Sequence, residues 1–205
     1  MGWYDDRLLP HIITLACGVK PVRMQREKIV PQATGDVLEI GFGSGPNLPY
    51  YNRSNIRKIW GLEPSAGMRK LAAAPIAASG MDVELIDLPG EEIPLQAGSV
   101  DTVLVTYTLC TIPEVGPTLE GIRRVLKPGG QLLFCEHGCA PDPGVRRWQD
   151  KLNTGWGRLA GGCNMNRDIP YIIESAGFSI IDDNRMYIPG LRILSYNFWG
   201  AAAVR

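Results

Sequence analysis

Three glycines stand at every second position directly after a short apolar run, in the stretch DVLEIGFGSG (Asp36–Gly45). Because Gly41, Gly43 and Gly45 lack a Cβ atom, the backbone there can adopt positive φ angles and lie against a flat ligand. An acid, Glu63, ends the next apolar run, 22 positions after Gly41. A carboxylate at that spacing can accept hydrogen bonds from both hydroxyls of a ribose. Together these residues indicate a nucleoside-binding site.

Short apolar runs that alternate with helical patterns predict the elements that hold these residues. Each run is short and continuous enough to be a parallel strand that is buried on both faces. The expected strands are Asp36–Gly41, Lys58–Glu63, Met81–Asp87, Val100–Tyr107 and Gln131–Glu136. Alternation of this kind implies right-handed βαβ units and one open, mostly parallel sheet, in which ligands bind beyond the carboxyl ends of the strands.

Two helices and a hairpin complete the expected fold. Ser65 can cap a helix that continues to Ser79, and Pro75 is expected to bend or split it. A second helix covers residues 118–126 and stops at the sequence KPGG, which turns the chain into the fifth strand. Near the end of the chain, residues 178–187 and 191–204 read as two strands joined by a Pro-Gly turn, an antiparallel hairpin that closes the sheet.

The motif around the glycines distinguishes between two cofactor classes. Dinucleotide enzymes favour G-x-G-x-x-G, with the last glycine opening a helix toward a pyrophosphate. Here Pro46 follows the glycines, and the pattern is E-x-G-x-G-x-G from Glu39 to Gly45. This pattern resembles the motif of methyltransferases that use S-adenosylmethionine (SAM). A nicotinamide oxidoreductase on a related fold is the disfavoured alternative.

Further segments extend the resemblance over roughly residues 35–136. Glu63, the sequences GSVD and LKPGG, and their order after the glycines are similar to class I SAM-dependent methyltransferases of the type 11 domain kind. The resemblance implies a Rossmann-like α/β sandwich with a mostly parallel seven-stranded sheet and a C-terminal antiparallel hairpin. It also implies a single domain, with covering helices in residues 1–30, a SAM-binding core in 35–136, and substrate-side helices and the closing hairpin in 137–205.

The resemblance implies which residues contact SAM, whose product is S-adenosylhomocysteine. The core GEEIPL (residues 90–95) is similar to the segment that borders the adenine in this family. Pro89 stands where the family most often has an acid, so Asp87 is the expected substitute, and a solvated turn acid is its alternative reading. The expected SAM contacts are Glu39, Gly41, Gly43, Gly45, Asn47, Leu48, Glu63, Pro64, Met68, Asp87, Leu88, Pro89, Glu91, Thr106, Tyr107 and Thr108.

The C-terminal third narrows the resemblance to one branch. The order E-H, W-Q, a second Trp, G-G-C-N and an Arg resembles the methyltransferase-like 7 branch of animals. Members of that branch methylate alkyl thiols at the endoplasmic reticulum, which makes a small, apolar thiol the expected acceptor. The alternatives are O-, N- or C-methylation of a quinone, phospholipid or natural product, and a non-catalytic module that binds SAM or its product.

Acceptor-side residues follow from their places after the strands. His137, just past the fifth strand, is the candidate base, since an unperturbed imidazole titrates near neutrality; a structural histidine is the alternative. Asn164 is expected either to orient the substrate or to fix its turn. Direct methyl transfer needs no enzyme nucleophile, so a covalent role is not expected for Cys163. The expected substrate contacts are Trp3, Tyr4, Cys110, Trp148 and Cys163, and Trp156 is an aromatic of the same covering segments.

Composition sets the remaining bounds. The 205-residue chain is 45% hydrophobic, which suits one domain, and its formal net charge of zero does not suggest a nucleic-acid partner. Five cysteines without a C-x-x-C pair, and only two histidines, predict neither a disulfide framework nor a metal site. Reduced cysteines are typical of a cytoplasmic protein.

The N-terminal sequence bears on membrane association. The sequence MGWYDDRLLPHIITLACGVK lacks a basic start, and its apolar part is interrupted by Pro10, so neither a signal peptide nor a transmembrane helix is expected. An amphipathic surface helix with peripheral membrane contact is left open. Because the animal relatives carry a hydrophobic anchor that this sequence lacks, membrane residence is not inferred from the resemblance.

Overall fold

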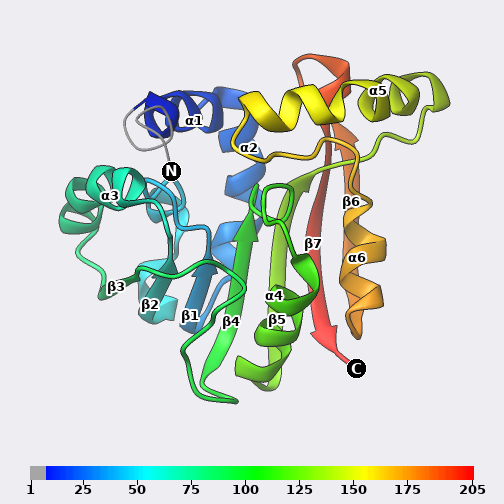
Figure 1. Ribbon diagram of the computed structural model, residues 1–205. Coiled ribbons are helices and arrows are strands. Elements are labelled where there is room, and N and C mark those ends of the chain that lie inside the picture. The colour runs from blue at the N-terminus through cyan, green and yellow to red at the C-terminus, as the bar shows by residue number, and fades with distance from the viewer. Residues whose placement is uncertain (1–7) are drawn as a thin grey trace.

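A seven-stranded sheet forms the centre of the computed structural model, which describes residues 8–205 (Figure 1). The strands are ordered β3-β2-β1-β4-β5-β7-β6. Five run parallel: β1 (Gly35–Ile40), β2 (Ile56–Leu62), β3 (Val83–Ile86), β4 (Val100–Thr106) and β5 (Leu126–His137). Strand β7 (Tyr196–Val204) lies antiparallel between β5 and β6 (Phe178–Tyr187). The predicted Rossmann-like α/β sheet with a closing hairpin is confirmed.

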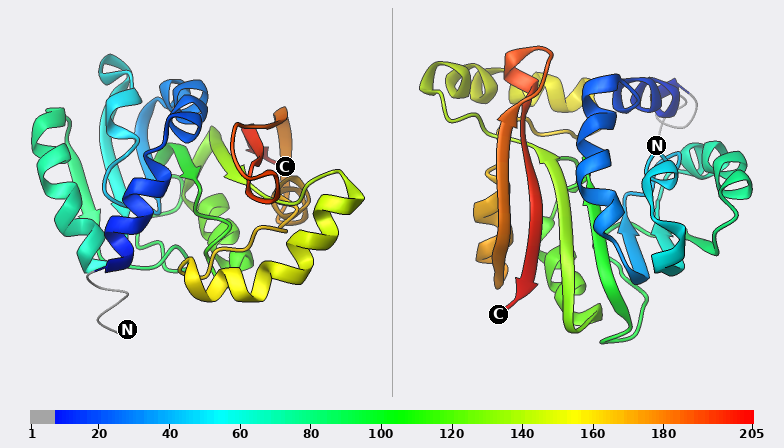
Figure 2. Two further views of the ribbon diagram at one scale, coloured as in Figure 1. Left: turned by 90° about the horizontal axis from the view of Figure 1, so that it is seen from above. Right: turned by 180° about the vertical axis from the view of Figure 1, so that it is seen from behind.

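Helices cover both faces of the sheet and the end where the parallel strands finish. Figure 1 shows α4 (Val115–Val125) and α6 (Ile169–Ser175) on one face, and the rear view in Figure 2 shows α2 (Lys20–Ile29) on the other. Helices α1 (Leu9–Cys17) and α5 (Pro143–Leu159) lie beyond the ends of β1 and β4, and α3 (Ala66–Ser79) stands near the β3 edge. Short 3-10 helices lie in three connections of the described residues: η2 (Val30–Gln32) before β1, η3 (Leu48–Tyr50) and η4 (Arg53–Asn55) between β1 and β2, and η5 (Arg192–Leu194) between β6 and β7.

Burial on both faces explains why the parallel strands read as continuous apolar runs. Neighbouring side chains of one strand enter opposite cores: Leu38 packs on the side of α4 and α6, and Val37 packs on the side of α2. Leu132 and Leu133 divide in the same way on β5. Because successive side chains of a strand point to opposite faces, two covered faces require apolar residues at every position.

Two details of the expected elements differ from the structure. Helix α3 begins at the predicted cap, where the Ser65 side chain accepts a hydrogen bond from the Met68 N–H, but the helix runs through Pro75 without a break. Proline removes a single donor, and the alanine-rich turns on either side keep their helix propensity. Strand β5 already begins at Leu126, so the KPGG sequence lies within the strand assignment, with an irregular register opposite Val100 and Thr102.

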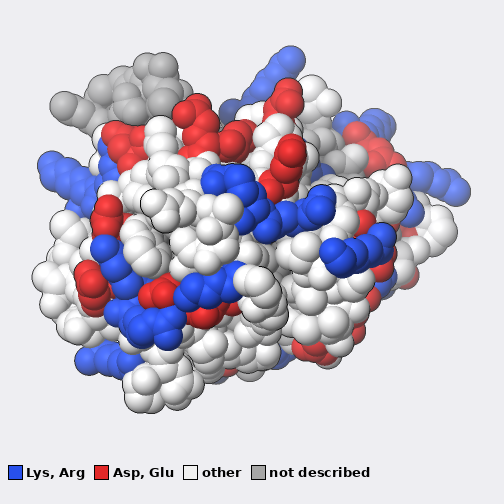
Figure 3. Space-filling model, turned by 90° about the horizontal axis from the view of Figure 1, so that it is seen from below, with Lys and Arg blue, Asp and Glu red and all other residues white. Residues whose placement is uncertain are grey.

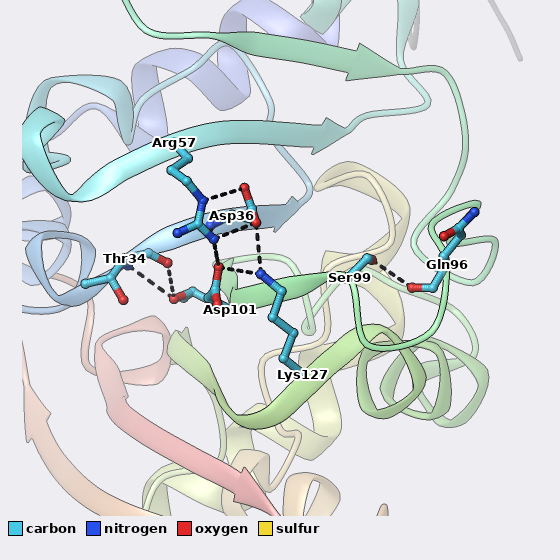
Figure 4. Close-up of polar contacts among 8 residues, drawn as sticks. Thr34, Asp36, Arg57, Gln96, Ser99, Asp101 and Lys127 are labelled. Atoms are coloured by element: carbon cyan, nitrogen blue, oxygen red, sulfur yellow. Dashed lines mark hydrogen bonds and ion pairs between the residues drawn. The ribbon is translucent and has the colours of Figure 1, made fainter.

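Charged side chains of both signs are interspersed at the opposite end of the molecule, which Figure 3 shows from below. Four of them converge from four strands (Figure 4). Asp36 lies 2.6 Å from Arg57 and 2.9 Å from Lys127, and Asp101 lies 2.9 Å from Lys127. Arg57 foremost, together with Lys127, lowers the pKa of Asp36 to about 2. The cluster ties the amino ends of β1, β2, β4 and β5 together.

Replacing Asp36 with Asn should reduce the free energy of unfolding by about 1–2 kcal/mol at pH 7, once solvent screening is allowed for. A carboxylate whose pKa is lowered by folding stabilises the protein above its unfolded pKa, and this contribution disappears as the pH falls through the folded pKa. The difference between Asp36→Asn and the unmodified protein should therefore shrink from pH 4 to pH 2 in urea unfolding experiments. Glu120→Gln, at an exposed site on α4, is the control. A difference that stays constant over this range would contradict the assignment.

Candidate active site at the carboxyl ends of the strands

The glycine turn directly follows β1, and its three glycines have φ angles of +70°, +58° and +79°. A Cβ atom on Gly41 would lie 2.3 Å from Oγ1 of Thr108, so Gly41 permits close packing against the segment after β4. A Cβ atom on Gly43 would meet no atom nearer than 3.9 Å. The space in the direction of a Cβ atom at Gly43 is therefore open.

Glu63 lies beside this turn, as the sequence predicted. Its carboxylate accepts hydrogen bonds from the backbone N–H of Gly43 at 2.8 Å and of Ser65 at 2.9 Å. The side chain is largely buried, and burial raises its pKa although both hydrogen bonds favour the charged form. Each carboxylate oxygen keeps a second lone pair, so Glu63 can still accept bonds from two neighbouring hydroxyls.

A buried network of polar side chains holds the glycine turn against the sheet and α2. Glu39 accepts hydrogen bonds from Asn47 at 2.8 Å and from Tyr51 at 2.6 Å. Arg26 on α2 donates to Asn47 at 2.8 Å and to Thr106 at 2.6 Å, and its side chain is fully buried. Burial raises the pKa of Glu39 to about 7, against the effect of its two donors. The network joins α2, β1, the turn and the end of β4 into one unit.

The segment after β4 has a strained backbone. Tyr107 has a φ angle of +54°, and it is the one non-glycine residue with positive φ in the part of the chain that the structure describes. Such strain persists only where surrounding contacts impose it, and it gathers at functional sites. Here the Tyr107 hydroxyl donates to Asn197 at 2.7 Å, and the N–H groups of Thr108 and Leu109 donate to one oxygen of Glu136 at 2.6 and 3.0 Å.

Glu136 is a site residue that the sequence prediction missed, although it stands in the quoted E-H pair. Its other carboxylate oxygen, Oε2, is buried and has no hydrogen-bond partner in the described chain. Burial raises the pKa of Glu136 to about 7. A buried acceptor without a partner costs free energy unless a ligand or water satisfies it, so Glu136 marks a place for a hydrogen-bond donor beside Thr108.

His137, Cys110 and Cys163 come together from three separate segments. The two Sγ atoms and a ring nitrogen of His137 all lie within 4.8 Å of one another, and Nε2 of His137 is 3.1 Å from Sγ of Cys163. The Cys110 thiol and the His137 ring lower the pKa of Cys163 despite its burial. Burial alone would lower the pKa of His137, but its bond to Cys163 raises the pKa above the usual value. Nδ1 of His137 is buried without a partner in the described chain.

Motif residues of the C-terminal third hold this cluster in place. The Gln149 side chain, fully buried on α5, bonds the backbone at Gly138, Ala140, Met165 and Ile193. It therefore connects the segment after β5 with the segment that carries Cys163.

Asn164 and Arg167 make further connections across the cluster. The Asn164 side chain donates to the carbonyls of Cys110 and Gly162 and accepts from Asn153. Arg167 donates to the carbonyls of Leu109 and Ile112. Since its amide is bound to this chain at both ends, Asn164 fixes the turn, which was one of its two predicted roles; substrate orientation stays a prediction.

Helix α1 covers the site between the glycine turn and the segment after α5. Thr14 lies 3.2 Å from the Ser44 hydroxyl and 3.9 Å from the Met68 sulfur. At its other end, Leu9 lies against Gly161, where an added Cβ would be 3.1 Å from its Cδ2. The view from above in Figure 2 shows α1 crossing this end of the molecule. The predicted covering role of the N-terminal segment fits this placement.

The remaining predicted residues have varied surroundings. Both oxygens of Asp87 accept hydrogen bonds from Arg69 at 2.5 and 2.6 Å, so an adenine contact would share this exposed carboxylate with an arginine. Trp148 is 55% exposed on α5, with the Lys151 ammonium over its ring, a surface position rather than a pocket wall. Trp3 and Tyr4 lie outside the described residues. Leu48 and Met68 are buried, Leu88, Pro89 and Glu91 are half-buried, and Pro64 is exposed.

The sheet order, the glycine turn after β1 and the acid at the end of β2 define a class I methyltransferase. Comparison with known proteins agrees: residues 38–134 match the family described as "Methyltransferase domain". The thiol S-methyltransferase TMT1B of Homo sapiens is 32% identical over 163 residues, covering 77% of this chain and 66% of that protein. The thiol S-methyltransferase TMT1A of Homo sapiens is 31% identical over 153 residues, covering 73% and 62%.

Solved structures agree on the fold. A SAM-dependent methyltransferase of Leishmania major superimposes with a TM-score of 0.72 at 17% identity, covering 98% of this chain and 83% of that one. The chain belongs to the class I SAM-dependent methyltransferases. It spans about two thirds or less of the length of the thiol methyltransferases that it matches.

The residues present fit SAM, which carries a sulfonium and an ammonium group. The open backbone at Gly43 and the buried carboxylates of Glu63 and Glu136 offer a flat surface and acceptors to a cationic nucleoside. Between residues 8 and 205, no helix has both the length and the apolar character to span a bilayer. The cytoplasmic location stays a prediction.

Replacing Glu63 with Gln should weaken SAM binding by about tenfold or more, because hydrogen bonds to a carboxylate are stronger than those to a neutral amide. Isothermal titration with S-adenosylhomocysteine measures the change. Glu174→Gln, at an exposed position of α6 outside the predicted SAM contacts, is the matched control. Unchanged affinity in a folded Glu63→Gln variant would contradict the ribose assignment.

Proposed function

We propose that the acceptor is a small thiol and that the protein catalyses S-methylation by direct displacement. Two features support this proposal. The thiol S-methyltransferases above share about a third of their residues with this chain over three quarters of its length. In addition, a histidine with an unpartnered buried nitrogen stands among two sulfur atoms at the carboxyl ends of β4 and β5.

The chemistry requires an ionised sulfur atom on the acceptor. SAM, when bound, supplies an electrophilic methyl group on a sulfonium. Even a cysteine thiol, with a pKa of about 8.5, is only partly ionised at neutral pH, and a simple alkyl thiol is a weaker acid, so a base that takes its proton raises the reactive fraction. An aliphatic alcohol would need stronger assistance, and a thiolate is a better nucleophile toward a methyl group than a phenolate, which makes a thiol the acceptor that these residues serve best.

His137 is the proposed base, and its Nδ1 atom is the observation that carries the assignment. This nitrogen is buried and bound to nothing in the described chain, whereas Nε2 is held by Cys163. A neutral imidazole can therefore accept the acceptor's proton at Nδ1 while its ring orientation is fixed through Nε2. The ring of Tyr107 stacks on that of His137 with centroids 6.4 Å apart, which further fixes the orientation of the imidazole.

The rest of the site supplies alignment. The network of Arg26, Asn47 and Thr106 fixes the glycine turn relative to the segment after β4, and Glu136 holds that segment from β5. Holding two reactants in line can lower a barrier by about 7–11 kcal/mol. Helix α1 and the segment after α5 exclude water from the methyl acceptor. Methyl transfer between two sulfur atoms needs little more from the protein than this positioning and one proton transfer.

The direct experiment incubates the protein with SAM and a matched panel of alkyl thiols, phenols, quinols and amines, and measures S-adenosylhomocysteine. Turnover is expected with apolar alkyl thiols, and the methyl thioether should appear in equal amount. Turnover only with a phenol, quinol or amine would contradict the thiol proposal. Binding of SAM without turnover of any acceptor would favour a non-catalytic binding module.

The His137→Ala variant tests the base assignment. It should lower kcat by about a hundredfold or more with an alkyl thiol, the usual range for a general base, while the affinity for SAM changes little. An aryl thiol is already ionised at neutral pH, so its kcat should fall far less. His11→Ala, at the exposed second histidine of the sequence, is the control. Equal losses with both thiols would indicate that His137 is structural.

A further inference from the structure

The cluster of Cys110, His137 and Cys163 has a property that the methyl transfer does not require. Its members are separated by 26 or more positions in the sequence, so they do not form a sequence motif with the short spacing that is typical of metal ligands. The fold nevertheless places two sulfur atoms and one ring nitrogen within 4.8 Å of one another. Two thiols and an imidazole are the donor set that borderline and soft metal ions prefer.

The donor atoms lie close enough together to be brought into a tetrahedral zinc site. Zinc bonds of about 2.3 Å to sulfur and 2.0–2.1 Å to nitrogen place neighbouring donor atoms about 3.5–3.8 Å apart. Nε2 of His137 and Sγ of Cys163 are 3.1 Å apart, so a change of a few tenths of an ångström would admit the ion between them. The remaining donor pairs are separated by no more than 4.8 Å, so shifts of about 1 Å at most would give the spacing of a tetrahedral site.

Hydrogen bonds from neighbouring side chains hold the segments that carry the three residues of the cluster in place. The backbone at Cys110 is bound twice by Asn164, through its N–H at 2.8 Å and its side-chain amide at 3.1 Å. Gln149 connects the segment that carries Cys163 to the end of β5 through Met165 and Gly138. Donor groups held in advance by such bonds lose little conformational entropy on binding an ion. Both cysteines are buried, which keeps competing water low.

We infer that Cys110, His137 and Cys163 form a three-ligand site for a thiophilic divalent cation, Zn²⁺ above all, with the fourth position open. Binding exchanges the thiol protons for the metal and releases them to solvent. Magnesium and calcium are excluded, because they require oxygen ligands.

The proposed function makes metal binding inhibitory. A metal ion on Nε2 leaves the neutral His137 ring with its proton on Nδ1, so the ring can no longer act as the base. Zn²⁺ should therefore inhibit methyl transfer. This consequence rests on the proposed function, whereas the binding itself does not.

A titration of the full chain with Co²⁺, without SAM or acceptor, tests the site. Co²⁺ bound to thiolates gives a charge-transfer absorption band, which should saturate at one equivalent and vanish when Zn²⁺ displaces the weaker-binding Co²⁺. Cys110→Ser and Cys163→Ser should each weaken binding by more than about tenfold. Cys139→Ser, whose sulfur instead accepts from Arg146, should bind normally. Absence of the band, or unchanged binding in both variants, would overturn the site.

Alkylation of the unmodified protein gives a second readout that needs no variant. Iodoacetamide is applied for several hours, so that local opening exposes the buried thiols, and mass spectrometry of the peptides should show that Zn²⁺ slows the labelling of Cys110 and Cys163 but leaves that of Cys139 as before. Equal protection of all three, or of none, would overturn the inference. Since neither experiment measures methyl transfer, loss of thiol turnover and loss of metal binding are separate results.

Discussion

The buried guanidinium of Arg26 is the contact on which the site's geometry depends. It donates from α2 to Asn47 beside the glycine turn and to Thr106 at the end of β4, and so joins the turn to the segment after β4. A buried charge without hydrogen bonds would be prohibitively costly, so the network around Glu39 must form as a unit. As a result, the position of the glycine turn relative to the segment after β4 is fixed before a ligand binds.

The acceptor side is built by a different set of contacts. Gln149, Asn164 and Arg167 bond backbone groups from segments far apart in the sequence, and each belongs to the C-terminal pattern that distinguished one branch of the family. The W-Q, G-G-C-N and Arg pattern of the C-terminal third is thus accounted for by hydrogen bonds that position the loops, and not by groups that react. They hold the loop after β4 against the segment after α5, which brings Cys110 to Cys163 and His137.

Most of the fold could be predicted because its signals are local. Apolar strands buried on both faces, the Ser65 cap and the glycine turn each follow from a few neighbouring residues. The position of Glu63 beside the glycine turn could be predicted because its motif sits directly at a strand end, whereas its contact with a ribose stays a prediction. Arg26 and Glu136 were not predicted because only tertiary packing buries them, and the exposure of Trp148 on α5 could not be read from the sequence without the partners of that helix. The grouping of Cys110 with Cys163 likewise arises from the long-range contacts of Asn164.

The central claim is that the glycine turn after β1 and the acids Glu63 and Glu136 orient the cofactor toward the cluster of Cys110, His137 and Cys163. A crystal structure with S-adenosylhomocysteine tests this claim most directly. The account predicts both ribose hydroxyls on the Glu63 carboxylate, the adenosine against Gly43, and the sulfur of the ligand facing His137. A ligand bound elsewhere, or bound in the cleft with its sulfur turned away from Cys110, His137 and Cys163, would contradict it.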